Sequence, residues 1–338
     1  MWLMVVALAL PLSACGGDEP TAAPSTPTAP SAPATPVPSN DWALSGHLLA
    51  YASGAPVSGA HLTSPDLGPS DTDAQGGFRF SGTTTPAKTQ ARVTIEAPGY
   101  VTRESTVTWQ RGSRDITLDL IPLKAPFSLD FYRQLVRNAF EAPTRLEPLR
   151  RLTASPRFYV RTVDEAGKPI EPEVLALVVA TLPRAVRTFS AGRLDAAQVD
   201  QGTESRPRTS GWINVIFQRD PKSELCGQAF VGADAGQITL WDDTCNCGSV
   251  KIPGEVTLHE VGHAMGFWHV PDRGSVMYPQ ANVGCPNGVL SQAEQFHSAL
   301  AYSRSPGNLD PDSEPAGVLY ARPDDAANPP EVSCPAHR

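Results

Sequence analysis

The sequence is poor in histidine, cysteine and basic charge, and each shortage narrows what the chain can do. Only seven histidines and six cysteines occur among its 338 residues. Lys and Arg number 27 against 35 Asp and Glu, for a net charge of −8, so no basic excess indicates nucleic-acid binding. The apolar stretch at residues 1–14 is too short to span a bilayer as a mature helix. Because histidine is scarce, a segment where several gather is informative.

The N-terminus has the pattern of an export signal. Residues 1–14, "MWLMVVALALPLSA", are an apolar run that ends in small residues, as in a signal peptide. With Cys15 the run closes as "LSAC" and resembles the lipobox of bacterial lipoproteins, which implies cleavage before Cys15 and a lipid on its sulfur. Gly16 then favours the outer membrane. We expect a lipid-anchored protein of the bacterial cell envelope, or a secreted one if Cys15 is incidental.

Residues 15–40 are expected to form a spacer. After Cys15 the segment is dominated by Pro, Thr, Ala and Ser without apolar periodicity. Such a composition cannot bury enough surface to offset the entropy of ordering, and its prolines keep it extended. The sequence therefore predicts a disordered linker between the lipidated cysteine and the folded part of the chain.

Residues 41–123 read as a small all-β domain. Short alternating segments such as "ARVTIEA" and "DITLDLI" are separated by turn residues, which predicts an antiparallel β-sandwich. The region resembles the carboxypeptidase regulatory-like domain, which implies a prealbumin-like sandwich. Asp71, Asp73 and Gly76 faintly resemble a calcium loop, but the ligand set is too short and a hairpin turn is expected.

The remainder alternates helix and strand, which predicts an α+β fold. Residues 124–156 are expected to be a helical connector, with a helix over 128–140 capped by Ser128. Residues 157–310 contain the strands "RFYVRTV", "GWINVIFQ" and "GQITLW", the last of them expected at a sheet edge, and a helix over 172–189 that Pro183 should kink or break. Residues 311–338 are expected to be a C-terminal tail.

One segment, "HEVGHAMGFWH", gathers three of the histidines. A helix beginning near residue 255 places His259 and His263 on one face, a separation that suits two ligands of one Zn²⁺. Glu260 lies beside them without having to ligate, so it could act as general base on a zinc-bound water. Gly266 lets the chain turn and deliver His269 as third ligand. Three imidazoles leave a fourth position open, as in catalytic sites.

The segment resembles the metzincin zinc endopeptidases, which share the pattern HExxHxxGxxH followed by a methionine turn. Met277 in "SVMYP" matches that turn and is most like the matrixins. The resemblance implies a twisted mixed sheet plus helices, one catalytic zinc ion and peptide-bond hydrolysis of extracellular or envelope proteins. It also implies that "GQITLW" lines the cleft rim and that a C-terminal helix follows Ser291, which forms a capping box with Glu294.

Two departures from the family pattern stand out. The position two residues after the methionine, where astacins have a tyrosine that reaches the metal, is Pro279. No stretch resembles a matrixin cysteine-switch propeptide, so the sequence carries no argument for or against latency. The alternative function is a cell-surface binding lipoprotein with a vestigial zinc site.

Other candidate ligands have simpler interpretations. His47, His61, His297 and His337 are expected to be ordinary surface or core histidines. Asp310 and Asp312 could hold calcium, but nothing further in the sequence supports a calcium site and a solvated loop is expected. The partners implied are a protein or peptide substrate and a membrane reached through the lipid; we expect a monomer.

The cysteines fit an exported chain. Apart from Cys15 they number five, and four lie around the histidine motif, where disulfides could brace a cleft: Cys226, Cys245, Cys247 and Cys285. Cys245 and Cys247 are too close together to pair, so each is expected to pair with Cys226 or Cys285. Cys334 is then the expected free thiol. A cysteine-rich zinc knuckle is the alternative, although paired CxxC units are absent.

Overall fold

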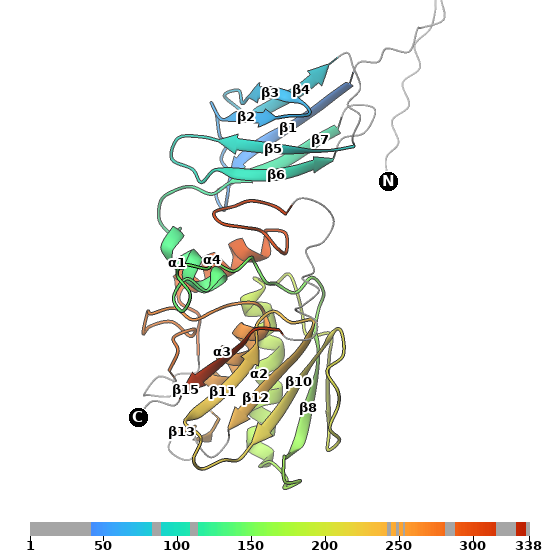
Figure 1. Ribbon diagram of the computed structural model, residues 1–338, viewed down its shortest axis with the longest axis vertical. Helices are drawn as coiled ribbons and strands as arrows, with labels where there is room; N and C mark the ends of the chain where they lie inside the picture. Colours follow the sequence, from blue (N-terminus) through green and yellow to red (C-terminus); the bar gives the residue numbers. More distant parts are fainter. Residues whose placement is uncertain are drawn as a thin grey trace, which may run out of the picture. The chain divides into compact units, whose positions relative to one another are not determined.

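The computed structural model describes residues 42–82, 89–108, 114–241, 245–247, 250–252, 254–280, 288–315 and 329–335. In these residues the fold is mixed, with four helices and several sheets, in agreement with the α+β prediction (Figure 1). No helix within them is long and apolar enough to cross a bilayer. The predictions for the signal peptide, the linker, Cys15, Cys285 and His337 lie outside these residues, as does the side chain of Cys247.

The N-terminal part consists of two sheets around one apolar core. The strand orders are β4-β1-β7 and β3-β2-β5-β6. Alternate residues such as Leu44, Phe80 and Val93 point into the shared core, as the alternating sequence predicts. The strands are β1 (Trp42–Ala50), β2 (His61–Ser64), β3 (Gly68–Asp71), β4 (Gly77–Gly82), β5 (Gln90–Glu96), β6 (Arg103–Thr108) and β7 (Arg114–Leu120).

The prediction that this sandwich is antiparallel is wrong for one strand pair. β1 and β7 run parallel, with Leu44 opposite Arg114 and Ala50 opposite Leu120. The chain reaches β7 by crossing from the other sheet, where β6 lies, so no hairpin fixes its direction. Alternation of apolar residues reports which face is buried but carries no information on strand direction.

The expected hairpin turn at Asp73 is present. Its Oδ1 accepts hydrogen bonds from the backbone N–H groups of Gln75 (2.9 Å) and Gly77 (2.7 Å), and Gly76 adopts a φ of 75°. Asp71 lies outside this turn and contacts His61 at 2.7 Å. The loop is therefore held by its own backbone donors.

The connector begins with α1 (Leu129–Arg137), which the Ser128 side chain caps by accepting from the N–H of Phe131. The helix is shorter than predicted. It ends where Asn138 takes a left-handed conformation with φ 58°, a residue type that tolerates this region. The chain that follows, including Glu141, is thereby free to turn away from the helix axis.

The C-terminal part is built on a six-stranded sheet in the order β15-β11-β12-β10-β8-β9. β9, β8, β10 and β12 are parallel neighbours, whereas β11 is antiparallel to β12 and β15 antiparallel to β11. Its strands are β8 (Arg157–Asp164), β9 (Gln198–Gly202), β10 (Trp212–Gln218), β11 (Leu225–Phe230), β12 (Ala235–Trp241) and β15 (Glu331–Pro335), beside a small pair, β13 (Asn246–Cys247) and β14 (Val250–Lys251).

Two sequence predictions about this sheet are wrong. "GQITLW" belongs to β12, which lies inside the sheet with Ile238 and Leu240 fully buried, so it is not an edge strand. β11 is the next strand beyond β12 in the sheet, because the chain turns back from β11 and pairs antiparallel with it as β12. Residues 331–335, expected in a tail, form β15 on the far side of β11. Neither arrangement is visible in local periodicity, since both depend on pairing between distant segments.

Helices α2 (Pro172–Phe189) and α3 (Gly254–Ala264) pack against the sheet (Figure 1). The expected break at Pro183 does not occur: α2 continues through it, and Pro183 lies on the exposed face, where solvent can satisfy the carbonyl that loses its N–H partner. The buried face of α2, with Val178, Leu182 and Ala185, covers the sheet. α4 (Gln292–Tyr302) follows the histidine motif.

The expected solvated loop at Asp310 and Asp312 is also wrong. Asp310 accepts hydrogen bonds from the Arg133 guanidinium at 2.9 and 2.7 Å. Asp312 is buried and its Oδ1 lies 2.8 Å from Nε of Arg304, whose side chain is itself fully buried. Arginine donors therefore satisfy both carboxylates, a pairing between elements that sequence cannot reveal.

Candidate metal centre

α3 supplies the first two candidate ligands. His259 and His263 are buried and four residues apart on one face of the helix, and their Nε2 atoms lie 3.0 Å from each other. This is the arrangement that the sequence spacing predicts.

Gly266 ends the helix as predicted and brings back the third histidine. Its φ is 104°, and a Cβ at this position would lie 1.3 Å from the carbonyl oxygen of Arg150, so no other residue fits. The turn returns His269 to the helix, with its Nε2 3.2 Å from that of His263 and 3.3 Å from that of His259.

The Nδ1 atoms of the three rings all face acceptors. Nδ1 of His259 lies 2.5 Å from the carbonyl oxygen of Val276, that of His263 lies 2.7 Å from the carbonyl oxygen of Phe267, and that of His269 lies 2.6 Å from Oε1 of Glu141. Each Nδ1 therefore carries a proton, and in the neutral form of each ring Nε2 keeps a lone pair for a metal. Three lone pairs directed at one point repel one another, and a bound cation removes that repulsion.

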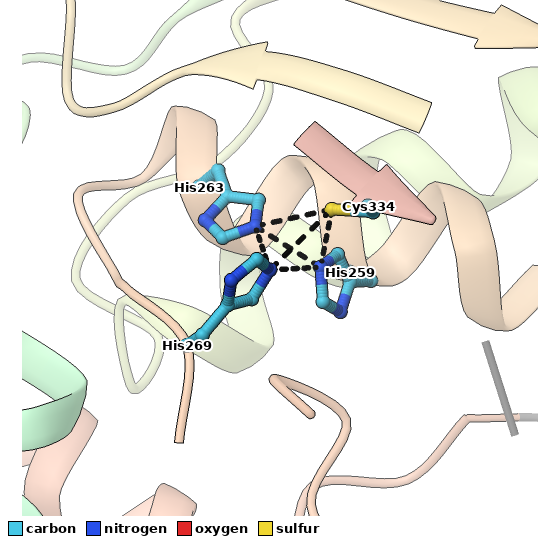
Figure 2. A group of neighbouring side chains, drawn as sticks. All are labelled: His259, His263, His269 and Cys334. Carbon is cyan, nitrogen blue, oxygen red and sulfur yellow. Dashed lines mark hydrogen bonds between the residues drawn. The ribbon is translucent and has the colours of Figure 1, made fainter. Parts of the chain in front are cut away.

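Cys334 completes the group. Its Sγ lies 2.8 Å from Nε2 of His259 and 3.5 Å from those of His263 and His269, and all four donor atoms lie within 4.8 Å of one another. Figure 2 shows the thiol projecting from β15 toward the three rings. The sequence identified Cys334 as a free thiol, which is confirmed, but assigned it no role at the site.

The four donors fit a single tetrahedral ion. With metal–nitrogen bonds of about 2.0–2.1 Å and a metal–sulfur bond of about 2.3 Å, tetrahedral geometry puts nitrogens about 3.3 Å apart and sulfur about 3.6 Å from each nitrogen. The nitrogen separations are 3.0–3.3 Å and the sulfur separations 2.8–3.5 Å. The cluster could therefore hold a metal ion with little rearrangement.

Burial keeps His259 and His263 neutral. Burial first, and then the nearby His269, lowers the pKa of His259 to about 3. The pKa of His263 is held well below its usual value, again mainly by burial and then by the two neighbouring histidines. Neutral imidazole is the form that binds a metal, so protons do not compete with the metal for these nitrogens near neutral pH.

Glu260 is a fully buried carboxyl next to the donors. Burial raises its pKa to about 8, partly offset by the adjoining Cys334 thiol. Apart from the Cys334 thiol, neither carboxyl oxygen has a hydrogen-bond partner among the described residues. The side chain packs against Gly227 of β11, where a Cβ would lie 2.0 Å from its Oε1. A fully buried acid with so few polar neighbours is costly, and such groups typically serve chemistry.

Met277 packs against α3, the helix that carries His259 and His263. It is fully buried, and its Sδ packs against Gly262 of α3, where a Cβ would lie 2.5 Å away. The turn is held by Glu294, whose Oε1 accepts from the Met277 N–H at 3.1 Å and from the Ser275 hydroxyl at 2.5 Å. The predicted capping box of Ser291 with Glu294 is confirmed, so the α4 N-terminus also braces the turn.

The cysteine predictions are confirmed where the structure describes them. Cys226 of β11 forms a disulfide with Cys245, which follows β12. The third cysteine whose side chain is described, Cys334, lies among the histidines, so these three side chains form no separate zinc knuckle.

Two other histidines have local roles, as expected. His61 is exposed and lies against Asp71. His297 is buried and contacts the backbone of Ala293 and Ser128. The residue that sequence analysis missed is Glu141, which lies 128 positions before His269 and shows no local signal.

Comparison with known proteins gives only weak likenesses. No protein-family model matches the chain, and no curated protein matches it in sequence. Among solved structures, metalloproteinase-II from Bacteroides fragilis is 10% identical over 77% of this chain and 84% of its own, with a TM-score of 0.32. A hydroxyquinol 1,2-dioxygenase from Pseudomonas putida is 14% identical over 24% of this chain and 56% of its own, with a TM-score of 0.20. The C-terminal domain of the Caf1A usher is 12% identical over 24% of this chain and 99% of its own, with a TM-score of 0.19. These scores are too low to assign a family.

Proposed function

We propose that this protein is a zinc-dependent endopeptidase of the metzincin type. The observation that carries the proposal is the convergence of the three Nε2 atoms beside the fully buried carboxyl of Glu260. Imidazole nitrogens and a thiol sulfur favour zinc, because the hard cations calcium and magnesium take oxygen ligands instead.

When bound, zinc would supply Lewis-acid polarisation of the scissile carbonyl and of the attacking water. His259, His263 and His269 would hold it, with their Nδ1 contacts fixing the orientation of each ring. Glu260 takes the proton of the attacking water and passes it to the leaving amine. Its raised pKa suits both steps, because a carboxyl that titrates near neutral pH can accept a proton and release it.

β11, which β15 covers in this structure, would offer an edge for an extended substrate if β15 were displaced. It runs next to the histidines, and Gly227 lies directly against Glu260. Substrate pairing with an edge strand would present successive peptide groups to the site through main-chain hydrogen bonds. The Cys226–Cys245 disulfide fixes this strand at its N-terminal end. The substrate class is therefore an unfolded or extended polypeptide.

We further propose that the chain is exported and held on the bacterial envelope by a lipid on Cys15, with the residues up to 40 as spacer. The "LSAC" stretch and the Pro-rich composition support this reading. An exported location also agrees with the Cys226–Cys245 disulfide.

A second candidate function is a binding lipoprotein whose metal is structural. The observation that favours it is the complete four-donor set, because structural zinc sites are closed by four protein ligands. Such a site would hold the fold together and have no open position for a substrate.

The test uses Cys334→Ala in the full chain, since the thiol lies where a substrate would bind. After zinc loading and metal analysis, cleavage of casein is measured with and without a chelator. We expect chelator-sensitive cleavage that disappears in Cys334→Ala/Glu260→Gln. A folded Cys334→Ala protein that holds one zinc ion and cleaves nothing would exclude the endopeptidase and leave the structural site.

A further inference from the structure

We propose that the chain carries its own inhibitor, strand β15, which fills the substrate edge while the Cys334 thiolate takes the fourth position on the metal. The functional consequence, latency of a peptidase, depends on the proposed function. The pairing of β15 with β11 and the binding of a metal by Cys334 do not depend on the proposed function.

The first observation is that β15 occupies the edge of β11. The two strands are antiparallel, with Phe230 opposite Glu331, Ala229 opposite Val332 and Gly227 opposite Cys334. An extended peptide that pairs with β11 needs those same N–H and C=O groups. While β15 is in place, no substrate can pair there.

The second observation is the register of the strand. Val332 and Cys334 are two residues apart, so both point to the same face, and both are buried while Ser333 between them is exposed. Val332 packs with Val231 and Trp268 in a small apolar cluster. This register places Sγ of Cys334 next to the three Nε2 atoms, where the scissile peptide group of a substrate paired with β11 would lie.

The third observation is Glu260. A permanently structural metal site needs only the four donors, and a fully buried carboxyl whose one polar neighbour is the Cys334 thiol would weaken it. Here that carboxyl adjoins the thiol that closes the site. Its presence makes sense if the thiol is displaced at some stage, because removal of β15 would give Glu260 access to water beside the metal.

Few contacts keep β15 in place, so the strand can be released. These contacts are the five-residue antiparallel ladder with β11, one further backbone hydrogen bond from the Val231 N–H to the Pro330 carbonyl (2.8 Å), and the two buried side chains of Val332 and Cys334. A thiol-reactive compound, or cleavage of the strand, would remove the fourth ligand and free the edge together.

The experiment compares the full chain with Cys334→Ala, Cys334→Ser and the control Ser333→Ala, which alters the exposed face of the same strand. Each protein is loaded with cobalt(II), and bound cobalt is quantified. We expect a thiolate-to-cobalt charge-transfer absorption in the wild type and in Ser333→Ala, and its loss in both Cys334 variants while cobalt stays bound. Thermal unfolding confirms that each variant is folded.

Acetohydroxamate, a small metal chelator, then reports whether the fourth position is open. We expect it to bind cobalt-loaded Cys334→Ala at least about tenfold more tightly than the wild type, as for a site that is mostly masked. Absence of the charge-transfer absorption in the cobalt-loaded wild type overturns the proposal without any variant, as do equal hydroxamate affinities. If Cys334→Ala binds hydroxamate tightly and yet cleaves no polypeptide, Cys334 does mask the fourth metal position, but the protein is not an endopeptidase.

Discussion

Oε1 of Glu141 lies 2.6 Å from Nδ1 of His269, so a carboxylate from the segment after α1 orients a candidate metal ligand 128 residues later. The His269 side chain is buried and that of Glu141 is 38% exposed, which makes the contact a directed hydrogen bond at the border of the site. The other two ligands use backbone carbonyls for the same purpose, so His269 is the one whose orientation a single side-chain substitution can disturb.

Glu141→Gln should weaken metal binding by about 10- to 100-fold, the usual cost of removing an outer partner of a metal-bound histidine. Competition for zinc with a chromophoric chelator measures this affinity. Glu173→Gln on the exposed face of α2 is the control and should leave the affinity unchanged. An unaltered affinity in Glu141→Gln would show that His269 needs no such partner.

In the Cys334→Ala background, Glu260→Gln should retain zinc and the fold but reduce peptide cleavage by about 100- to 10,000-fold, the typical contribution of a general base. Metal analysis and thermal unfolding establish that the variant is intact, and a fluorogenic peptide gives the rate. Comparable rates for the two proteins would refute the assignment of Glu260 as the base.

Gly227→Ala should damage the site without touching a ligand. The new Cβ would lie 2.0 Å from Oε1 of Glu260, so the carboxyl or β11 must move. We expect a stability loss of about 1–3 kcal/mol, typical of overpacking, and slower cleavage at unchanged zinc content. Gly254→Ala, whose Cβ would meet Leu177 at a comfortable 3.6 Å, is the matched control. If Gly227→Ala and Gly254→Ala have equal stability and equal cleavage rates, the close approach of Gly227 to Glu260 does not affect function.

Arg304→Met should be strongly destabilising. The Arg304 side chain is fully buried between Asp312, which is 1% exposed, and Asp119 on β7 at 2.6 Å, so its removal leaves a buried carboxylate uncompensated. The expected loss is about 3–5 kcal/mol in urea unfolding. Arg187→Met removes an exposed partner of Asp195 and should change little. A small effect at Arg304 would mean that Asp312 finds another partner or takes up a proton.

Cys15→Ala should release the protein from membranes, because the lipobox-like "LSAC" stretch is the anchor that the sequence predicts. Fractionation of cells that express the wild type and the variant measures this. A variant that still sediments with membranes would place the anchor elsewhere.

The local part of the site follows from sequence because it is made by segments whose geometry depends on near neighbours. A helix alone sets the separation of His259 and His263, a glycine alone permits the turn at residue 266, and Ser291 with Glu294 caps its helix from three residues away. The start of α1 and the two ends of α2 follow from the same short-range rules, whereas the expected break at Pro183 does not occur.

Tertiary structure decided the rest, because it depends on contacts between distant segments. Periodicity identified β12 as a strand, but its place inside the sheet comes from pairing with β10 and β11. β11 in turn pairs with β15, so β15 is the edge strand on that side. Glu141 and Cys334 reach the histidines across 128 and 75 residues of chain. No local spacing encodes such contacts, since they arise only when the sheet is assembled. The sequence alone thus identified three candidate metal ligands and a candidate base, and the fold decided that a strand from the C-terminal segment brings Cys334 to them.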